Sequence, residues 1–269
     1  MIKIGKNISS FSTHSCQPKS NEELKAIVND RISKYGIYCD LNDIDTSLIE
    51  DMSYLFDQSK FNGDISKWNV SNVKDMCRMF AHSTFNGNIS EWDVSNVQNM
   101  NGMFYTSKFN NDISDWNVSN VTNMMSMFYK CEELKSVGDI SEWDVSNVTD
   151  MAYMFTRCEN LNQDISKWGV SSVTDMSYMF FDCKKFNQDI SKWNVSNVKD
   201  MSFMFQYCDS FNQDLSEWDV SKVTDMNGMF QGCKSFNKDI SKWNVSKVKN
   251  NILMFFDCSI KDEYKPKFK

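Results

Sequence analysis

The sequence predicts a mainly β solenoid, a coil of about nine stacked repeats of about 25 residues each. Every tryptophan occupies one repeat position, at residues 68, 92, 116, 143, 168, 193, 218 and 243, so the steps are 24, 24, 27, 25, 25, 25 and 25 residues. Periods of about 20 to 50 residues are typical of solenoids, in which one unit cannot bury its apolar face without its neighbours. The composition agrees, because 20 Phe and 18 Met beside only 2 Pro are unusual for a loop-rich globular protein.

The two most regular copies define the apolar skeleton of the repeat. They read CENLNQDISKWGVSSVTDMSYMF from Cys158 and CKKFNQDISKWNVSNVKDMSFMF from Cys183. Their shared apolar positions are Phe (Leu in the first copy), Ile, Trp, Val, Val, Met, Met and Phe. Stacking turns each position into a ladder along the coil, and we predict that these ladders form the core. One such ladder is Phe80, Phe104, Phe128, Phe155, Phe180, Phe205, Phe230 and Phe255.

Each unit is predicted to contain strand, corner, strand and helical turn. The D-I-S-x-W and V-x-D-M segments have the β-branched and aromatic residues of short strands. Asn, Asp or Gly follows every Trp and indicates a sharp corner. A short acceptor precedes each Met-x-x-Met-Phe segment and suits the N-cap of a helical or 3₁₀ turn. These acceptors are Asp75, Asn99, Asn123, Asp150, Asp175, Asp200, Asp225 and Asn250.

A helix is predicted over residues 20–35, ahead of the repeats. Ser20 is followed three residues later by Glu23, and Leu24, Val28 and Ile32 follow at helical spacing. We expect this helix to cover the first coil, because solenoids need terminal caps. The predicted domains are an N-terminal segment at 1–47, the repeat solenoid at 48–260 and a tail at 261–269.

The 27-residue unit is the main irregularity of the array. Its two extra residues lie between Cys131 and Asp139. We predict a local bulge there, which interrupts one face of the solenoid. Packing of both Leu134 and Val137 without a bulge would contradict this alignment.

Charge and hydropathy exclude several function classes. The net charge of −7 and the isoelectric point near 5.0 argue against nucleic-acid binding, which depends on clustered Lys and Arg. No run of 18 apolar residues is present, so no membrane span is expected. The opening residues, from Met1 to Lys6, lack the apolar core of a secretory signal, and we expect no export of the chain as given.

Cysteines recur in register with the repeat, and small serines hold the matching earlier places, Ser59, Ser83 and Ser107. We favour a buried ladder of reduced thiols; some disulfides and a metal site remain alternatives, although no C-x-x-C pair supports zinc. No cofactor is predicted. The six cysteines in register are Cys131, Cys158, Cys183, Cys208, Cys233 and Cys258.

The sequence predicts that the protein is not an enzyme. Its two histidines, His14 and His82, lie far apart in the sequence, so a nucleophile–histidine site is hard to build. One carboxylate recurs in nearly every unit and is replaced once by Asn88, which favours turn capping over acid–base or calcium chemistry. These carboxylates are Asp64, Asp112, Asp164, Asp189, Asp214 and Asp239.

The position before each Trp is the most informative variable place. Invariant ladders pack, whereas variable ones face water, and exposed rows are what solenoids use to bind partners. This charged row is therefore the candidate partner-binding surface, with a solvated face of mixed charge as the alternative. It consists of Lys67, Glu91, Asp115, Glu142, Lys167, Lys192, Glu217 and Lys242.

The unit D-I-S-x-W-x-V-S-x-V-x-D-M-x-x-M-F-x-x-C resembles the BspA-like leucine-rich repeat family of surface proteins, also found as repeats in mycoplasma lipoproteins. The resemblance spans about Ile49 to Cys258. It implies a right-handed, leucine-rich-repeat-like solenoid used in adhesion or partner binding, and it supplies no catalytic residues.

Together these observations favour a non-enzymatic, adhesin-like module that presents one face to a protein or glycan partner. The alternative is an intracellular scaffold or effector that is never exported. The resemblance places the protein at the cell surface, whereas the missing signal peptide places it in the cytoplasm. The sequence leaves the oligomeric state open.

Overall fold

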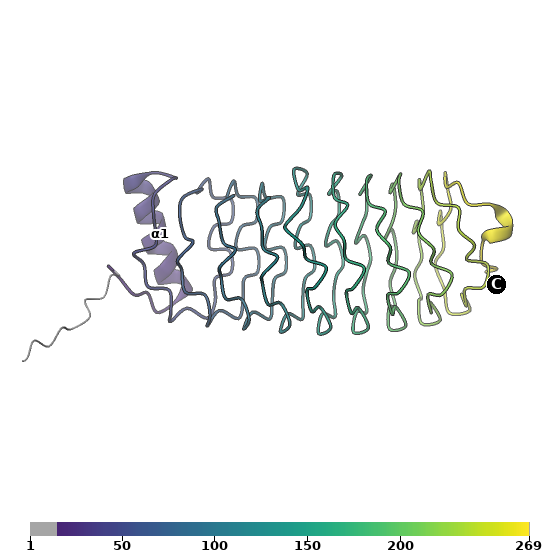
Figure 1. Ribbon diagram of the computed structural model, residues 1–269, viewed down its shortest axis with the longest axis horizontal. Coiled ribbons are helices and arrows are strands. Elements are labelled where there is room, and N and C mark those ends of the chain that lie inside the picture. The colour runs from purple at the N-terminus through teal and green to yellow at the C-terminus, as the bar shows by residue number, and fades with distance from the viewer. Residues whose placement is uncertain (1–14, 269) are drawn as a thin grey trace, which may run out of the picture.

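The computed structural model describes residues 15–268, which form one elongated row of stacked coils (Figure 1). Helix α1 (Asn21–Tyr35) closes one end of the row, and the short 3₁₀ helix η1 (Asp262–Tyr264) lies at the other. Neither helix of this described part has the length and apolar character needed to cross a membrane. The chain is therefore a repeat solenoid, as the tryptophan spacing predicts; the handedness of its coil stays a prediction.

The predicted strands are wrong in extent. The part of the chain described forms no strand longer than an isolated parallel bridge, and from Asp75 onward each coil is joined to the next by one bridge, as at Asp75 and Asn99. The D-I-S-x-W segment is a turn, in which Asp64 Oδ1 accepts the Ser66 N–H at 2.9 Å and Trp68 N–H donates to Ile65 O at 3.1 Å. The Asp that opens the segment closes a turn more readily than it extends a strand.

The predicted helical turn after Asp75 is also wrong. Overlapping turns replace it, and the two that begin at Met76 and Phe80 are closed by Met79 N–H to Met76 O and by Ser83 N–H to Phe80 O. The third residue of each turn has positive φ, 52° at Arg78 and 54° at His82, which is the type II pattern and excludes a helix. The acceptor role of Asp75 is confirmed, because its Oδ1 accepts the Cys77 N–H at 2.7 Å.

These paired turns hold neighbouring coils together. A helical turn would keep its N–H groups inside the coil, whereas here alternate N–H groups point along the solenoid axis. Arg78 N–H donates to Asn101 O and Phe80 N–H donates to Met103 O, each at 2.9 Å. Equivalent bonds recur between the following coils and fix their register.

Stacked side chains fill the interior as the repeat predicts. The tryptophans are only 3–5% exposed, and their indoles reach the preceding coil, as where Trp168 Nε1 donates to Ile140 O at 2.9 Å. Phenylalanines of successive coils stack face to face, with the centroids of Phe80 and Phe104 5.7 Å apart. Each coil thus buries its apolar surface against its neighbours.

Five of the six cysteines in the ladder are buried, Cys258 is half-buried, and all six thiols are free. Each inner thiol donates to a phenylalanine carbonyl of the preceding coil, for example Cys183 to Phe155 at 3.0 Å. Burial raises the pKa of Cys131 to about 12, so this thiol stays protonated and poorly nucleophilic at neutral pH.

Helix α1 begins and ends where predicted and caps the first coil. Ser20 Oγ accepts the Glu23 N–H, and Leu24 and Val28 are fully buried. The first coil has carbonyls that no preceding coil satisfies, and α1 supplies two donors to them. Asn21 Nδ2 donates to Ser53 O and Lys25 Nζ donates to Tyr54 O, each at 2.9 Å.

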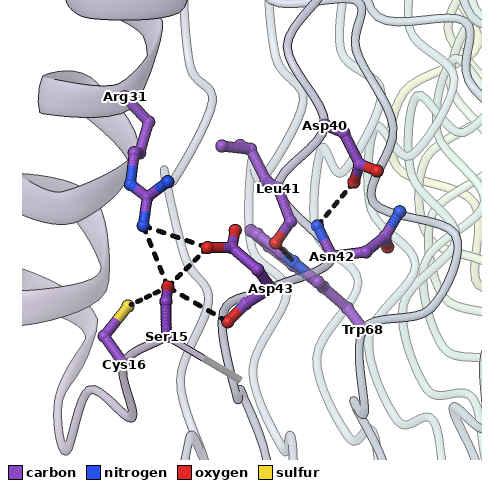
Figure 2. A network of polar contacts seen from close by, with 8 residues as sticks. All are labelled: Ser15, Cys16, Arg31, Asp40, Leu41, Asn42, Asp43 and Trp68. Atoms are coloured by element: carbon purple, nitrogen blue, oxygen red, sulfur yellow. Dashed lines mark hydrogen bonds and ion pairs between the residues drawn. The ribbon is translucent and has the colours of Figure 1, made fainter. Parts of the chain in front are cut away.

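A polar network ties the segment before α1 to the solenoid (Figure 2). Arg31 lies 3.0 Å from the Asp43 carboxylate and also donates to Ser15 Oγ at 2.9 Å. Ser15 donates to the same carboxylate. This hydrogen bond, followed by the charge of Arg31, lowers the pKa of Asp43, although partial burial opposes the shift.

In the 27-residue coil, some residues around the insertion point into the core and others point into solvent. Leu134 and Val137 are both fully buried, while Lys135 and Ser136 turn outward. Both apolar residues therefore pack, and the bulge at the outward pair stays a prediction. The insertion also leaves the buried Trp143 indole N–H without a hydrogen-bond partner, unlike the other seven tryptophans.

Candidate functional site

Every residue of the charged row is exposed to solvent. The row holds four lysines and four acidic residues, so its charges cancel. Glu142 and Lys167, which neighbour each other in the row, form an ion pair. A surface of this kind matches the solvated alternative as well as it matches a binding site, and no binding is shown for it.

A second surface, which sequence reasoning missed, lies over the paired turns and is here called the turn face. Three positions per coil form columns along the solenoid, and most of the larger side chains in these columns reach solvent. The first left-handed column is Tyr54, Arg78, Gly102, Ser126, Tyr153, Tyr178, Phe203, Gly228 and Leu253. The middle column follows the buried Phe and holds Asp57, Ala81, Tyr105, Tyr129, Thr156, Phe181, Gln206, Gln231 and Phe256. The second left-handed column is Gln58, His82, Thr106, Lys130, Arg157, Asp182, Tyr207, Gly232 and Asp257.

An aromatic stripe runs along the turn face across five coils. Tyr105 stacks on Tyr129 with centroids 4.5 Å apart, and Tyr178 stacks on both Tyr153 and Phe203 at 4.6 Å. Between Tyr129 and Tyr153 the stack breaks, with centroids 6.4 Å apart and planes tilted by 56°. The break marks where the stripe moves from the middle column to the first left-handed column. All five rings are partly exposed.

Three rings of the stripe stand on strained backbone. Tyr153, Tyr178 and Phe203 have φ of 61°, 57° and 58°. The left-handed conformation costs a side-chain-bearing residue roughly 1–2 kcal/mol, whereas glycine adopts it freely. Gly102 and Gly228 occupy the same column, so the turn itself does not require a ring. Stacking returns about 0.5–1.5 kcal/mol per pair, which only offsets the strain.

A ladder of half-buried carboxylates borders the stripe. In each one Oδ1 accepts the N–H two residues along, at 2.9 Å for Asp150 and 2.8 Å for Asp175. Burial, together with the charge of Asp175, raises the pKa of Asp150. Burial and the carboxylates of Asp175 and Asp200 also raise the pKa of Tyr153, so its hydroxyl stays protonated and can donate.

A pocket of about 240 Å³ opens where the stripe breaks. Thr156 stands in the middle column between Tyr129 and Phe181, and its small side chain leaves a gap between two large rings. Tyr153 and Tyr178 line the pocket from the first left-handed column, and Lys130 and Arg157 from the second. The pocket therefore has aromatic walls and two cationic side chains.

The structure places one of the two histidines and the recurring carboxylates that sequence analysis weighed as candidate catalytic groups. His82 contacts Asp57 at 3.1 Å and packs against Tyr105, while His14 lies outside the described residues. Over residues 15–268, no cluster of three or more His, Cys, Asp or Glu is placed to hold a metal ion. The recurring carboxylates close turns as predicted, for example Asp189 with Ser191 N–H at 2.9 Å.

Comparison with known proteins gives a family but no function. No curated protein matches the chain. The functional domain of InlJ from Listeria monocytogenes, a structure described as including a cysteine ladder, aligns with 80% of this chain at 12% sequence identity and a TM-score of 0.23. The match spans 55% of that structure's chain, and a TM-score this low supports no conclusion about this protein.

The repeat region matches one family model three times in succession. The matched ranges are 31–137, 132–226 and 190–264, which together span nearly all the described coils. The finer resemblance to BspA-like proteins stays a prediction. The chain thus belongs to the repeat family described as "Mycoplasma protein of unknown function, DUF285".

Proposed function

We propose that the protein is a non-enzymatic protein-binding module and that the turn face is its binding surface. The observation that carries the proposal is the aromatic stripe, in which three of the five rings stand on left-handed backbone. Residues held in costly conformations concentrate at functional sites, and glycine at Gly228 shows that the same turn forms without a ring. Tyr and Arg are also the residues most enriched at the energetic centres of protein interfaces.

The stacking geometry favours a protein over a glycan. Within the stripe the rings cover one another's faces, with planes only 8° apart between Tyr153 and Tyr178. They therefore offer edges and hydroxyls to a partner, whereas a sugar needs an open ring face for stacking. A polypeptide lying along the solenoid axis can contact several ring edges in turn. We assign the charged row to solvation.

The finer form of the proposal concerns where the module acts. The BspA-like resemblance supports an adhesin displayed on the cell surface, and an intracellular scaffold or effector is the alternative. Protease treatment of intact source cells, followed with an antibody to the chain, separates the two. Digestion supports display; full protection while the cells remain intact supports the intracellular role.

The binding role is tested by affinity capture from the source cells with three baits. The wild-type chain is compared with a Tyr153→Gly/Tyr178→Gly/Phe203→Gly variant and with a Lys67→Gln/Lys167→Gln/Lys242→Gln variant. Gly102 and Gly228 show that glycine fits the first left-handed column. We expect a discrete partner to be captured by the wild type and the lysine variant but not by the glycine variant. Loss with the lysine variant alone would assign binding to the charged row.

A further inference from the structure

The volume, aromatic walls and cationic side chains of the pocket at Thr156 together indicate which class of ligand it can bind. Its floor is fixed, because Thr156 is only 3% exposed and its hydroxyl donates to Tyr178 O at 2.6 Å. Its volume of about 240 Å³ lies below the roughly 300–1,000 Å³ of drug-sized ligand sites. A single side chain of a partner therefore suits it better than a cofactor.

The two cations of the pocket are poorly neutralised. Lys130 Nζ lies 5.5 Å above the Tyr129 ring, and in the described part of the chain no carboxylate is within ion-pair distance of it. Arg157 Nε lies 3.9 Å from Asp182, which is longer than a hydrogen bond. Asp182 also lies 3.8 Å from Lys184 and is shared between the two cations.

Both charged side chains that line the pocket are cations, which disfavours a cationic guest, although the Asp175 and Asp200 carboxylates act on Tyr153 from outside the lining. A cage of aromatic rings binds a cation through free ring faces. Here the Tyr129 ring already has Lys130 over it and also stacks on Tyr105. The edges of aromatic rings carry the positive part of the ring quadrupole and also favour an anion. An anionic group of a partner complements both the rings and the two cations.

We propose that this pocket binds an acidic side chain, that of a glutamate or aspartate, in the polypeptide segment that docks on the turn face. The assignment rests on the proposed protein-binding function and names the chemistry of its partner. The carboxylate pairs with Lys130 and Arg157, and the methylene of the side chain packs over Thr156 between Tyr129 and Phe181.

The test follows the Thr156 methyl signal by NMR in the full-length protein, with all threonine methyl groups labelled. The probes are the capped amino acids N-acetyl-glutamate amide and N-acetyl-glutamine amide, and glucuronic acid. We expect a saturable shift of the Thr156 methyl with the glutamate probe at millimolar concentration and at least about tenfold weaker binding of the glutamine probe. Equal binding of the two amino-acid probes contradicts the assignment, and tighter binding of glucuronic acid transfers the site to acidic sugars.

Matched variants locate the effect. In Lys130→Gln and Arg157→Gln the glutamate probe should bind about tenfold more weakly. Glutamine fits the backbone there, because Gln58 occupies the same column with φ of 60°. Asp182→Asn removes the competing carboxylate and should strengthen binding. Lys167→Gln, on the charged row, is the control without effect; if Lys130→Gln and Arg157→Gln behave like it, the assignment fails.

One further variant separates this inference from the proposed function. Lys130→Gln/Arg157→Gln is used as bait in the capture experiment beside the glycine variant of the stripe. Loss of the partner from both baits supports the pocket as part of the interface. Retention by the Lys130→Gln/Arg157→Gln bait, with loss from the glycine variant, would overturn the acidic-side-chain assignment and leave the protein-binding function intact.

Discussion

The inward and outward sides of the same turns differ in how far they repeat. Inward, the apolar residues recur in nearly every coil, so Phe155 has Phe128 and Phe180 as neighbours. Outward, the next position along holds a threonine, Thr156, between a tyrosine and a phenylalanine. Packing dictates the first set, whereas the backbone tolerates many residues in the second. Variation on the turn face is therefore where recognition can be encoded without loss of the fold.

The largest expected effect lies on the inward side. Trp168→Ala should lower the free energy of unfolding by about 3–5 kcal/mol, because it leaves a cavity and removes the indole bond to Ile140 O. Denaturant unfolding of the two proteins measures it. A loss below about 1 kcal/mol would contradict the inward packing that separates the two sides.

Acid should destabilise the coils through their turn-closing carboxylates. The Ser191 backbone N–H lowers the pKa of Asp189 below its ordinary value of 3.8, and Asp64 and Asp214 are lowered in the same way. A carboxyl group whose pKa is lower in the folded state than in the unfolded state stabilises the fold at pH values above its unfolded-state pKa. This stabilisation is lost as the pH falls through the folded-state pKa. Unfolding free energy measured from about pH 6 to about pH 2 should fall mainly below about pH 4.

Asn88 provides the control for this pH dependence. It occupies the same repeat position and accepts the Ser90 N–H at 3.0 Å without a charge. Asp189→Asn should therefore retain the fold at neutral pH and lose its share of the acid dependence. An unchanged pH profile in several such variants together would show that these carboxylates do not control acid stability.

A smaller effect on stability is expected on the outward side. Tyr178→Gly removes two ring stacks but also relieves left-handed strain, so the free energy of unfolding should change by less than about 1 kcal/mol. Partner capture should nevertheless fall. Denaturant unfolding and the capture experiment on the same preparation separate the two; a destabilisation comparable to that of Trp168→Ala would place Tyr178 in the core.

The charged row should show the smallest effect. Lys167→Gln breaks an exposed ion pair with Glu142, and exposed pairs contribute about 0–1 kcal/mol. Neither unfolding nor partner capture should change measurably. If Lys167→Gln no longer captures the partner while its free energy of unfolding is unchanged, the charged row is the binding surface.

The sequence predicts the coil and its capping helix because the buried residues recur at regular spacing along the chain. Trp168 recurs at a fixed step, and Ser20 with Glu23 starts a helix by a local hydrogen-bond pattern. The turns were missed because an Asp before Met76 suits a helix N-cap as well as it suits a turn. The positive φ of Arg78 could not be predicted from the sequence, because residues with bulky side chains seldom adopt this conformation.

The candidate site was missed for a related reason. Tyr129, Tyr153 and Phe181 occupy two different repeat positions, so alignment on one position does not reveal the stripe. The repeat alignment places Thr156 between Tyr129 and Phe181, but only the structure shows that residues of the two flanking columns complete a pocket there. The signal that was present is the excess of aromatic residues at the two variable positions that flank the recurring Met-Phe pair of each unit.

The central claim is that a partner binds the turn face and not the charged row, and site-specific cross-linking tests it most directly. Tyr207, an exposed ring of the turn face, and Lys167 of the charged row are replaced separately by a photo-reactive phenylalanine, and each protein is irradiated in the source cells. The account predicts a discrete cross-linked species from position 207 and none from position 167. The reverse pattern would contradict it.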